Sequence, residues 1–207
     1  MKNMISSRQM MFSVGTFIMA SSLLIKSLYS YLKQEAWIGV VLGFLISLPV
    51  IWIYQALAKR FPSKSLIEIN DAVFGRIVGK VVSVLYTFFF LSLTCLNTRE
   101  LGDFVKSVIL YKTPKVIIII MFIFVCAFAI QKGIRNLTRC SAIFVIVTIA
   151  SVLFYFLLLI NEIKLQNLLP MVTMPIENYL IGTHLVTALP LCEIFVFFML
   201  LPYMQKP

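Results

Sequence analysis

Six long apolar stretches fill most of the 207-residue chain, and each approaches or exceeds the length needed to cross a bilayer. A spanning helix requires about 20 predominantly apolar residues, with roughly 17 to 25 tolerated. A soluble core accounts for one or two such stretches but not for six in series. The sequence therefore predicts an all-α polytopic membrane protein that forms one transmembrane domain over residues 1–207, with spans at approximately 9–31, 36–58, 80–105, 115–132, 139–161 and 179–204.

The distribution of basic residues predicts the orientation of these spans. If the N-terminus is inside, the cytoplasmic segments hold eleven Lys and Arg residues and the outer segments hold six. Because basic loops are retained in the cytoplasm, we expect both termini there. The net charge of +10 does not indicate nucleic-acid binding, since the basic residues lie in short segments between spans and form no continuous stripe.

Enzymatic motifs are absent from the sequence. It contains no phosphate-binding loop, dinucleotide-binding fingerprint, H-E-x-x-H pair or nucleophile elbow. The four cysteines have no C-x-x-C spacing, and there is a single histidine. We therefore expect a protein that is not an enzyme, with no cofactor and no metal site.

The segment between the second and third spans predicts a short amphipathic helix on the inner membrane surface. Ser65 and Glu68 fit the S-x-x-E capping box that begins many helices. Apolar residues then recur at near-helical spacing up to Gly75, which is placed to stop the helix. Burial of the apolar face is the expected role of this segment.

The sixth span contains the most costly departure from a plain membrane helix. Pro190, which follows Leu189, removes one backbone donor and clashes with the preceding turn. Glu193 comes three residues later, and a carboxylate in hydrocarbon normally faces a cavity or a partner. We expect a discontinuous helix whose freed backbone groups, together with Cys192 and Glu193, could bind a solute at the midplane. A simple proline kink is the alternative, although a kink requires no charge.

The first span carries a run of small residues at Ala20, Ser21 and Ser22. Small residues either let membrane helices approach closely or open the backbone to a ligand, and close packing is the more common reason. The run supports a ligand site more strongly when it is considered together with the break in the sixth span. Two weakened helices that lie five helices apart are typical of inverted-repeat transporters.

Three charged residues, Arg99, Glu100 and Asp103, lie near the end of the third span. Arg99 and Asp103 are four residues apart and are therefore neighbours on one helix face. If the helix continues to Leu110, the charges lie inside the membrane or a water-filled vestibule and could form an ion or proton relay, or a gate. The alternative is an interfacial ion pair that caps the helix.

Short matches to one known family follow one another along essentially the whole chain. They are Ile5–Gln9, Glu35–Ile38, Arg60–Pro62 with Ser65–Glu68, Thr98–Glu100, Thr113–Pro114, Asn167–Pro170 and Glu193–Phe197 running to Leu201–Pro202. In this order and spacing, the chain resembles the spore-germination permeases. These are the membrane B subunits of nutrient germinant receptors, within the amino acid–polyamine–organocation transporter superfamily.

The resemblance implies a ten-helix fold of two inverted five-helix repeats, with broken first and sixth helices. This chain would supply the N-terminal six helices. Because helices seven to ten would lie beyond Pro207, we expect either a fragment or a bundle that another polypeptide completes. The resemblance also implies a location in the inner membrane of a spore and assembly with other germinant-receptor subunits.

The implied ligand is an amino acid or a similar small nutrient, bound between the two breaks. Backbone N–H groups at Ala20–Ser22 would receive its α-carboxylate, helped by the positive end of a half-helix. Carbonyls freed around Leu189 and Pro190 would accept its ammonium group, and Cys192 and Glu193 would shape the pocket.

Three functions therefore remain open. The first is a receptor subunit in which nutrient binding triggers germination through partner subunits. The second is an amino-acid permease coupled to a proton or sodium gradient. The third is a non-functional truncated remnant of such a protein, without affinity for a ligand.

Overall fold

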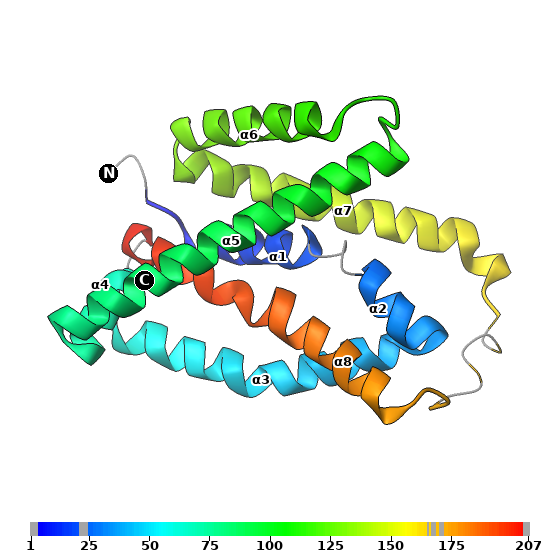
Figure 1. The fold of residues 1–207 in the computed structure, drawn as a ribbon, viewed down its shortest axis with the longest axis horizontal. Coiled ribbons are helices and arrows are strands. Elements are labelled where there is room, and N and C mark those ends of the chain that lie inside the picture. Colours follow the sequence, from blue (N-terminus) through cyan, green and yellow to red (C-terminus); the bar gives the residue numbers. More distant parts are fainter. Residues whose placement is uncertain (1–3, 21–24, 165, 167–168, 170–171, 205–207) are drawn as a thin grey trace. The chain divides into compact units, whose positions relative to one another are not determined.

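The computed structural model describes residues 4–20, 25–164, 166, 169 and 172–204. This part of the chain is helical, and its one extended pairing is an isolated bridge between Ile5 and Met204. Its α-helices (Figure 1), within these described residues, are α1 (Ser7–Ala20), α2 (Ile25–Leu32), α3 (Ala36–Arg60), α4 (Leu66–Phe74), α5 (Arg76–Val108), α6 (Lys115–Gln131), α7 (Ile134–Leu159) and α8 (Ile176–Val186).

The chain divides into two compact units. The first unit comprises Met1–Ser6, Phe61–Arg139 and Phe198–Pro207, and the second comprises Ser7–Arg60 and Cys140–Phe197. Each unit has its own packed helices. The expectation of one transmembrane domain over residues 1–207 stays a prediction.

Four helical segments in the described part of the chain are long and apolar enough to cross a membrane. They are Ser27–Arg60, Arg76–Val108, Ile134–Glu162 and Ile176–Tyr203. α6 is apolar but has 17 residues, and α1 has 14. Residues 21–24 of the first predicted span lie outside the described residues. Length and composition thus support four of the six predicted spans directly.

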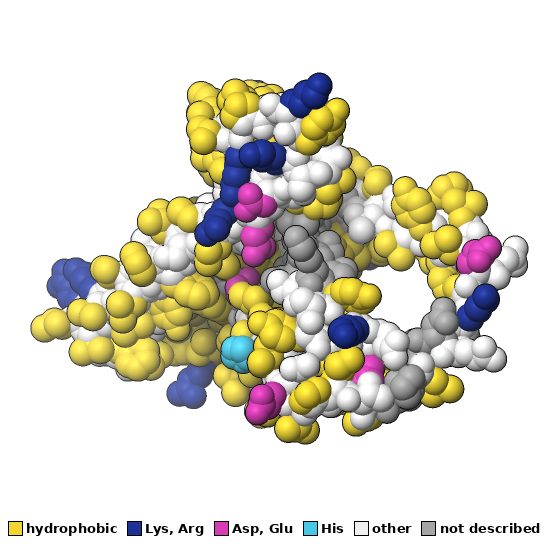
Figure 2. Space-filling model, turned by 45° about the vertical axis from the view of Figure 1, so that its right-hand side comes forward, with side chains coloured by type: hydrophobic (Ala, Val, Ile, Leu, Met, Phe, Trp, Pro, Cys, Tyr) yellow, Lys and Arg dark blue, Asp and Glu magenta, His cyan; other side chains and the backbone are white. Residues whose placement is uncertain are grey.

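Apolar and polar side chains are distributed as expected for a protein dissolved in lipid. Ser47 is fully buried and Thr138 is 2% exposed, whereas Trp52 and Phe124 are more than 70% exposed. Apolar side chains cover much of the helical surface in view (Figure 2). Soluble proteins rarely expose such extensive apolar surface, while membrane helices pack through small and hydroxyl residues. The predicted all-α, multi-pass membrane protein is therefore confirmed.

The predicted amphipathic helix is present in the first unit as α4. The Ser65 hydroxyl accepts a 3.4 Å hydrogen bond from the Glu68 backbone N–H, and the Ser65 backbone N–H donates to Glu68 Oε2 at 2.7 Å. These reciprocal contacts form the capping box. Donation from the Ser65 backbone and hydroxyl lowers the pKa of the Glu68 carboxyl below its ordinary value.

Gly75 ends α4 with φ of 79°, a conformation that glycine adopts at little cost. It also lets α5 begin at once, at Arg76 rather than near the predicted residue 80. The resulting α4–α5 hairpin is tight, because a Cβ on Gly79 would lie 2.7 Å from the Asp71 Cα. Asn70 donates to Ser83 Oγ at 3.2 Å and joins the two helices.

In the second unit, α3 and α8 lie side by side (Figure 1). Gly39, Gly43 and Ser47 are buried at four-residue spacing along α3, and Gly182 and Thr183 are buried on α8. Small residues at this spacing allow two membrane helices to pack with their backbones close together. The contact fixes α8, and with it the residues that follow α8.

Candidate functional site

The sixth apolar segment changes its helical type where the sequence predicts a discontinuity. α8 ends at Val186, a π-helical turn follows from Thr187 to Leu191, and a 3₁₀ segment continues from Glu193 to Tyr203. The Cys192 backbone N–H donates to the Thr187 carbonyl at 2.9 Å, across five residues. Pro190 lies inside this turn and cannot donate to an α-helical partner. Such π turns frequently mark functional sites in helices.

Tyr54 of α3 contacts the residue that follows the π turn. Its hydroxyl donates to the Cys192 carbonyl at 3.1 Å, and its ring centroid lies 6.4 Å from that of Phe195. One carbonyl beside the helical break therefore has a protein donor. Sequence reasoning missed Tyr54, although a polar ring inside an apolar span is a signal that could have identified it.

A second contact between α3 and the π turn involves Thr187. Its hydroxyl oxygen lies 2.8 Å from the Thr183 carbonyl and 3.3 Å from the Gly43 carbonyl, and either oxygen can accept its proton. Together with Tyr54, this contact attaches the π turn to α3 on both sides of Pro190.

The helix that precedes the first predicted break contacts the same π turn. α1 ends at Ala20, and α1 contacts the π turn within the second unit. Phe17 of α1 meets Phe197 edge to face, with ring centroids 5.6 Å apart. Ala20 is exposed, whereas Ser21 and Ser22 lie outside the described residues. The structure thus brings together two segments that are about 170 residues apart in the sequence.

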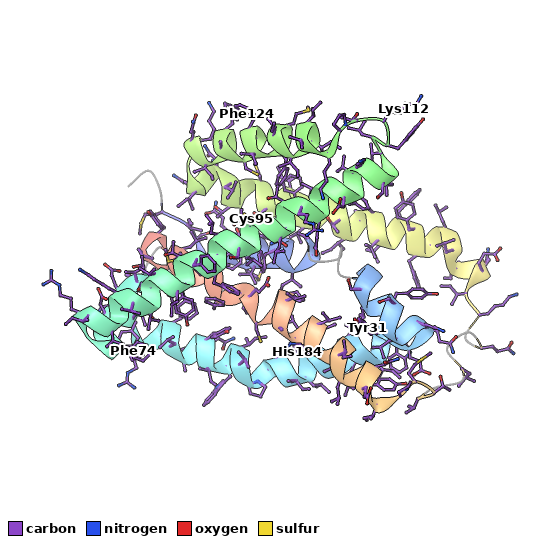
Figure 3. All side chains as sticks on the ribbon, viewed as in Figure 1. Tyr31, Phe74, Cys95, Lys112, Phe124 and His184 are labelled. Carbon is purple, nitrogen blue, oxygen red and sulfur yellow. The ribbon has the colours of Figure 1, made fainter. Side chains whose placement is uncertain are left out.

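The remaining predicted site residues follow one another around the π turn. Leu189, Pro190 and Cys192 are half-buried, and Glu193 is 8% exposed. A buried carboxylate inside a membrane helix is costly and usually serves a binding or transport function. His184 is exposed on α8, one turn before the break (Figure 3). Within the described residues, no group of three His, Cys, Asp or Glu side chains is placed to hold a metal ion.

The charged residues of the third span belong to the first unit and lie on α5. Asp103 Oδ2 is 3.9 Å from Arg99 Nε, and Asp103 Oδ1 is 2.6 Å from Lys115 Nζ. Lys115 begins α6, so Asp103 joins the end of one helix to the start of the next. Glu100 is exposed on the same helix. Sequence reasoning missed Lys115, because it considered charges on one helix only.

Comparison with known proteins identifies the family. A family model described as "Spore germination protein" matches residues 4–207. Spore germination protein KB of Bacillus subtilis (strain 168) is 28% identical over 97% of this chain and 54% of its own length. Putative spore germination protein YfkT of the same organism is 30% identical over 67% of this chain and 38% of its own length.

The chain therefore spans about half the length, or less, of these curated relatives. No solved structure matches it. The match of the family model to nearly every residue places the chain in the family of spore germination proteins.

Proposed function

We propose that the chain is part of a membrane subunit of a spore germinant receptor, which binds an amino acid or similar nutrient and helps to trigger germination. The observation that carries this proposal is the family match over residues 4–207. The geometry supports a ligand site, because α1 and the broken sixth segment contact each other within one unit.

The proposed site uses backbone groups for the charged ends of the nutrient. N–H groups at Ala20–Ser22 receive the carboxylate, and carbonyls around Leu189 and Pro190 accept the ammonium group. Cys192 and Glu193 shape the pocket. Tyr54 takes a further role, because its hydrogen bond to the Cys192 carbonyl fixes the backbone beside Glu193.

For the fold, we propose six spans with both termini in the cytoplasm, within a ten-helix inverted-repeat bundle. The interrupted sixth segment is the feature that supports this architecture, whereas residues 21–24 of the first span lie outside the described residues. The proposed location is the inner membrane of a spore, where other receptor subunits are the partners.

For the charged residues of α5, we propose either a relay or gate, or an interfacial ion pair that closes the α5–α6 connection. The 2.6 Å contact between Lys115 and Asp103 favours the ion pair, because it joins adjacent helix ends. The exposed Asp103 side chain favours it as well, since an exposed pair needs no transport function.

The same pocket would also suit an ion-coupled amino-acid permease. Uptake of a labelled amino acid into proteoliposomes, with and without an ion gradient, distinguishes the two functions. Strong concentrative uptake would favour the permease. A well-folded preparation that binds no nutrient would favour the non-functional remnant.

The site itself is tested by Glu193→Gln in spores, with germination measured against nutrient concentration. We expect normal membrane insertion and a shift of the half-maximal concentration, because the substitution removes a buried charge at nearly constant shape. Glu177→Gln, an exposed carboxylate in the first turn of α8, is the matched control. Identical curves for wild type and Glu193→Gln would refute the site assignment.

A further inference from the structure

A buried carboxylate holds the segment that enters α8. Glu35, immediately before α3, is 0% exposed. Its Oε1 accepts hydrogen bonds from the Thr173 backbone N–H at 2.9 Å and from the Thr173 hydroxyl at 2.6 Å. The second bond has the short distance typical of a hydroxyl donating to a charged oxygen. Thr173 itself is exposed, so the contact lies at the edge of the packed helices.

A second hydrogen bond fixes the same end of α8. The side-chain amide of Asn178, in the first turn of α8, donates to the Tyr31 carbonyl near the end of α2 at 3.0 Å. Below it, Tyr179 packs against Leu28 and Leu32 of α2. The N-terminal end of α8 is therefore attached to the Tyr31 carbonyl of α2 and to the Glu35 side chain before α3, both about 140 residues away in the sequence.

Two features destabilise the attached state of α8. Val172 adopts φ of 60°, a left-handed conformation that is unfavourable for a β-branched residue. Glu35 Oε2 is buried and has no hydrogen-bond partner among the residues that the structure describes. A strained backbone and a half-satisfied carboxylate both raise the free energy of the attached state. The attachment is thus held by a few strong hydrogen bonds against local strain.

α8 connects this attachment to the proposed ligand site. It runs from Ile176 to Val186 and continues directly into the π turn at Thr187–Leu191. A helix of this length moves as a rigid element, so displacement of its first turn also displaces the π turn.

We propose that the Glu35–Thr173 contact is a latch that holds α8 and the π turn in the resting position, and that its release makes the protein more sensitive to nutrient. The germination part of this inference rests on the proposed function. Glu35 and Thr173 are positioning residues, because they act through α8 and do not touch the ligand.

The test compares two substitutions at one position. Thr173→Val removes the hydroxyl donor at nearly constant shape, whereas Thr173→Ser retains both donors. Glu35→Gln keeps an oxygen acceptor but removes the charge, and it serves as a second, milder variant. Glu162→Gln alters an exposed carboxylate elsewhere in the second unit and is the control.

The first readout is amide hydrogen exchange of the full chain in native membrane vesicles. We expect Thr173→Val to accelerate exchange throughout residues 172–191 by roughly three- to tenfold, the factor associated with loss of one hydrogen bond. Thr173→Ser and Glu162→Gln should match the wild type. Acceleration confined to residues 172–175 would overturn the latch, because α8 and the π turn would then be independent of Thr173.

The second readout is the nutrient concentration for half-maximal germination. Release of a resting-state latch lowers this concentration in Thr173→Val by roughly threefold or more, with a smaller decrease in Glu35→Gln. A purely structural role would lower the maximal response, or raise the concentration, and either result would overturn the proposal.

The two readouts also separate failure of the latch from failure of the proposed function. If Glu193→Gln shifts germination but Thr173→Val does not, the latch is overturned and the proposed ligand site stands. If neither substitution changes germination although exchange accelerates through residue 191, the proposed ligand site fails, while the coupling of Thr173 to α8 stands.

Discussion

Alanine in place of Gly43 should loosen the contact between α3 and α8. A Cβ at this position would lie 2.8 Å from Val186 Cβ and Cγ1, and 3.2 Å from the Thr183 carbonyl oxygen. Val186 Cβ is attached directly to the backbone, so a side-chain rotation cannot move it away. α8 must therefore shift away from α3, and the Thr187 contact with the Gly43 carbonyl shifts with it.

Two opposing effects determine the magnitude. Overpacking a close contact costs about 1–3 kcal/mol. Replacing a helical glycine by alanine stabilises the folded protein by about 0.5–1 kcal/mol, because less backbone entropy is lost on folding. The packing term is the larger, and we expect a net loss of about 1 kcal/mol, which is a factor of about five in the folding equilibrium.

Gly15→Ala is the matched control for this measurement. A Cβ on Gly15 would meet Val145 Cγ2 at 3.6 Å, an ordinary van der Waals contact. We expect Gly15→Ala to be neutral or to stabilise the protein by about 0.4–1 kcal/mol. The assay is denaturant unfolding of both variants in the same detergent or lipid micelles. Equal stability of Gly43→Ala and wild type, or equal destabilisation by both substitutions, would refute the reasoning from the close α3–α8 contact.

Four further predictions concern individual side chains. Ser65→Ala should destabilise α4 by about 1 kcal/mol, through loss of the capping box, with no change in membrane insertion; thermal unfolding measures the loss. Because the folded-state pKa of Glu68 is lowered, its contribution to stability is complete above the unfolded pKa of about 4.3 and is lost as pH falls through the folded value. The unfolding midpoint of Glu68→Gln should therefore vary less with pH in the acid range than that of the wild type, and equal slopes would contradict this. Tyr54→Phe removes the donor to the Cys192 carbonyl and should shift the half-maximal nutrient concentration in spores, while unchanged germination would separate this hydrogen bond from the site. Asp103→Asn should alter stability by less than about 1 kcal/mol, because the ion pair is partly exposed, and a much larger loss would indicate that the charges lie in a low-dielectric environment.

Local features of the fold were predictable because their causes lie within a few residues. The length of apolar runs identified the membrane helices, and the Ser65–Glu68 pattern located the start of α4. Pro190 predicted the interruption of the sixth segment, since its missing donor acts on its own turn. Even here the type of interruption, a π turn followed by a 3₁₀ segment, was not specified by the proline.

The start of α5 depends on the backbone conformation of Gly75. Gly75 was expected to stop α4, and it does, but its φ of 79° also lets α5 begin at the next residue. α5 therefore begins a few residues before Lys80, at which the predicted third span starts.

The sequence by itself determined that the chain is helical, that it enters a membrane and where its sixth segment is interrupted, because these properties follow from composition and from neighbouring residues. Only the tertiary structure decided which residues far apart in the sequence contact one another. Tyr54 and Cys192, and likewise Glu35 and Thr173, are 138 residues apart in the chain. Such contacts depend on how the close packing of α3 and α8 aligns the two helices, and helix periodicity within a single sequence carries no information about that alignment.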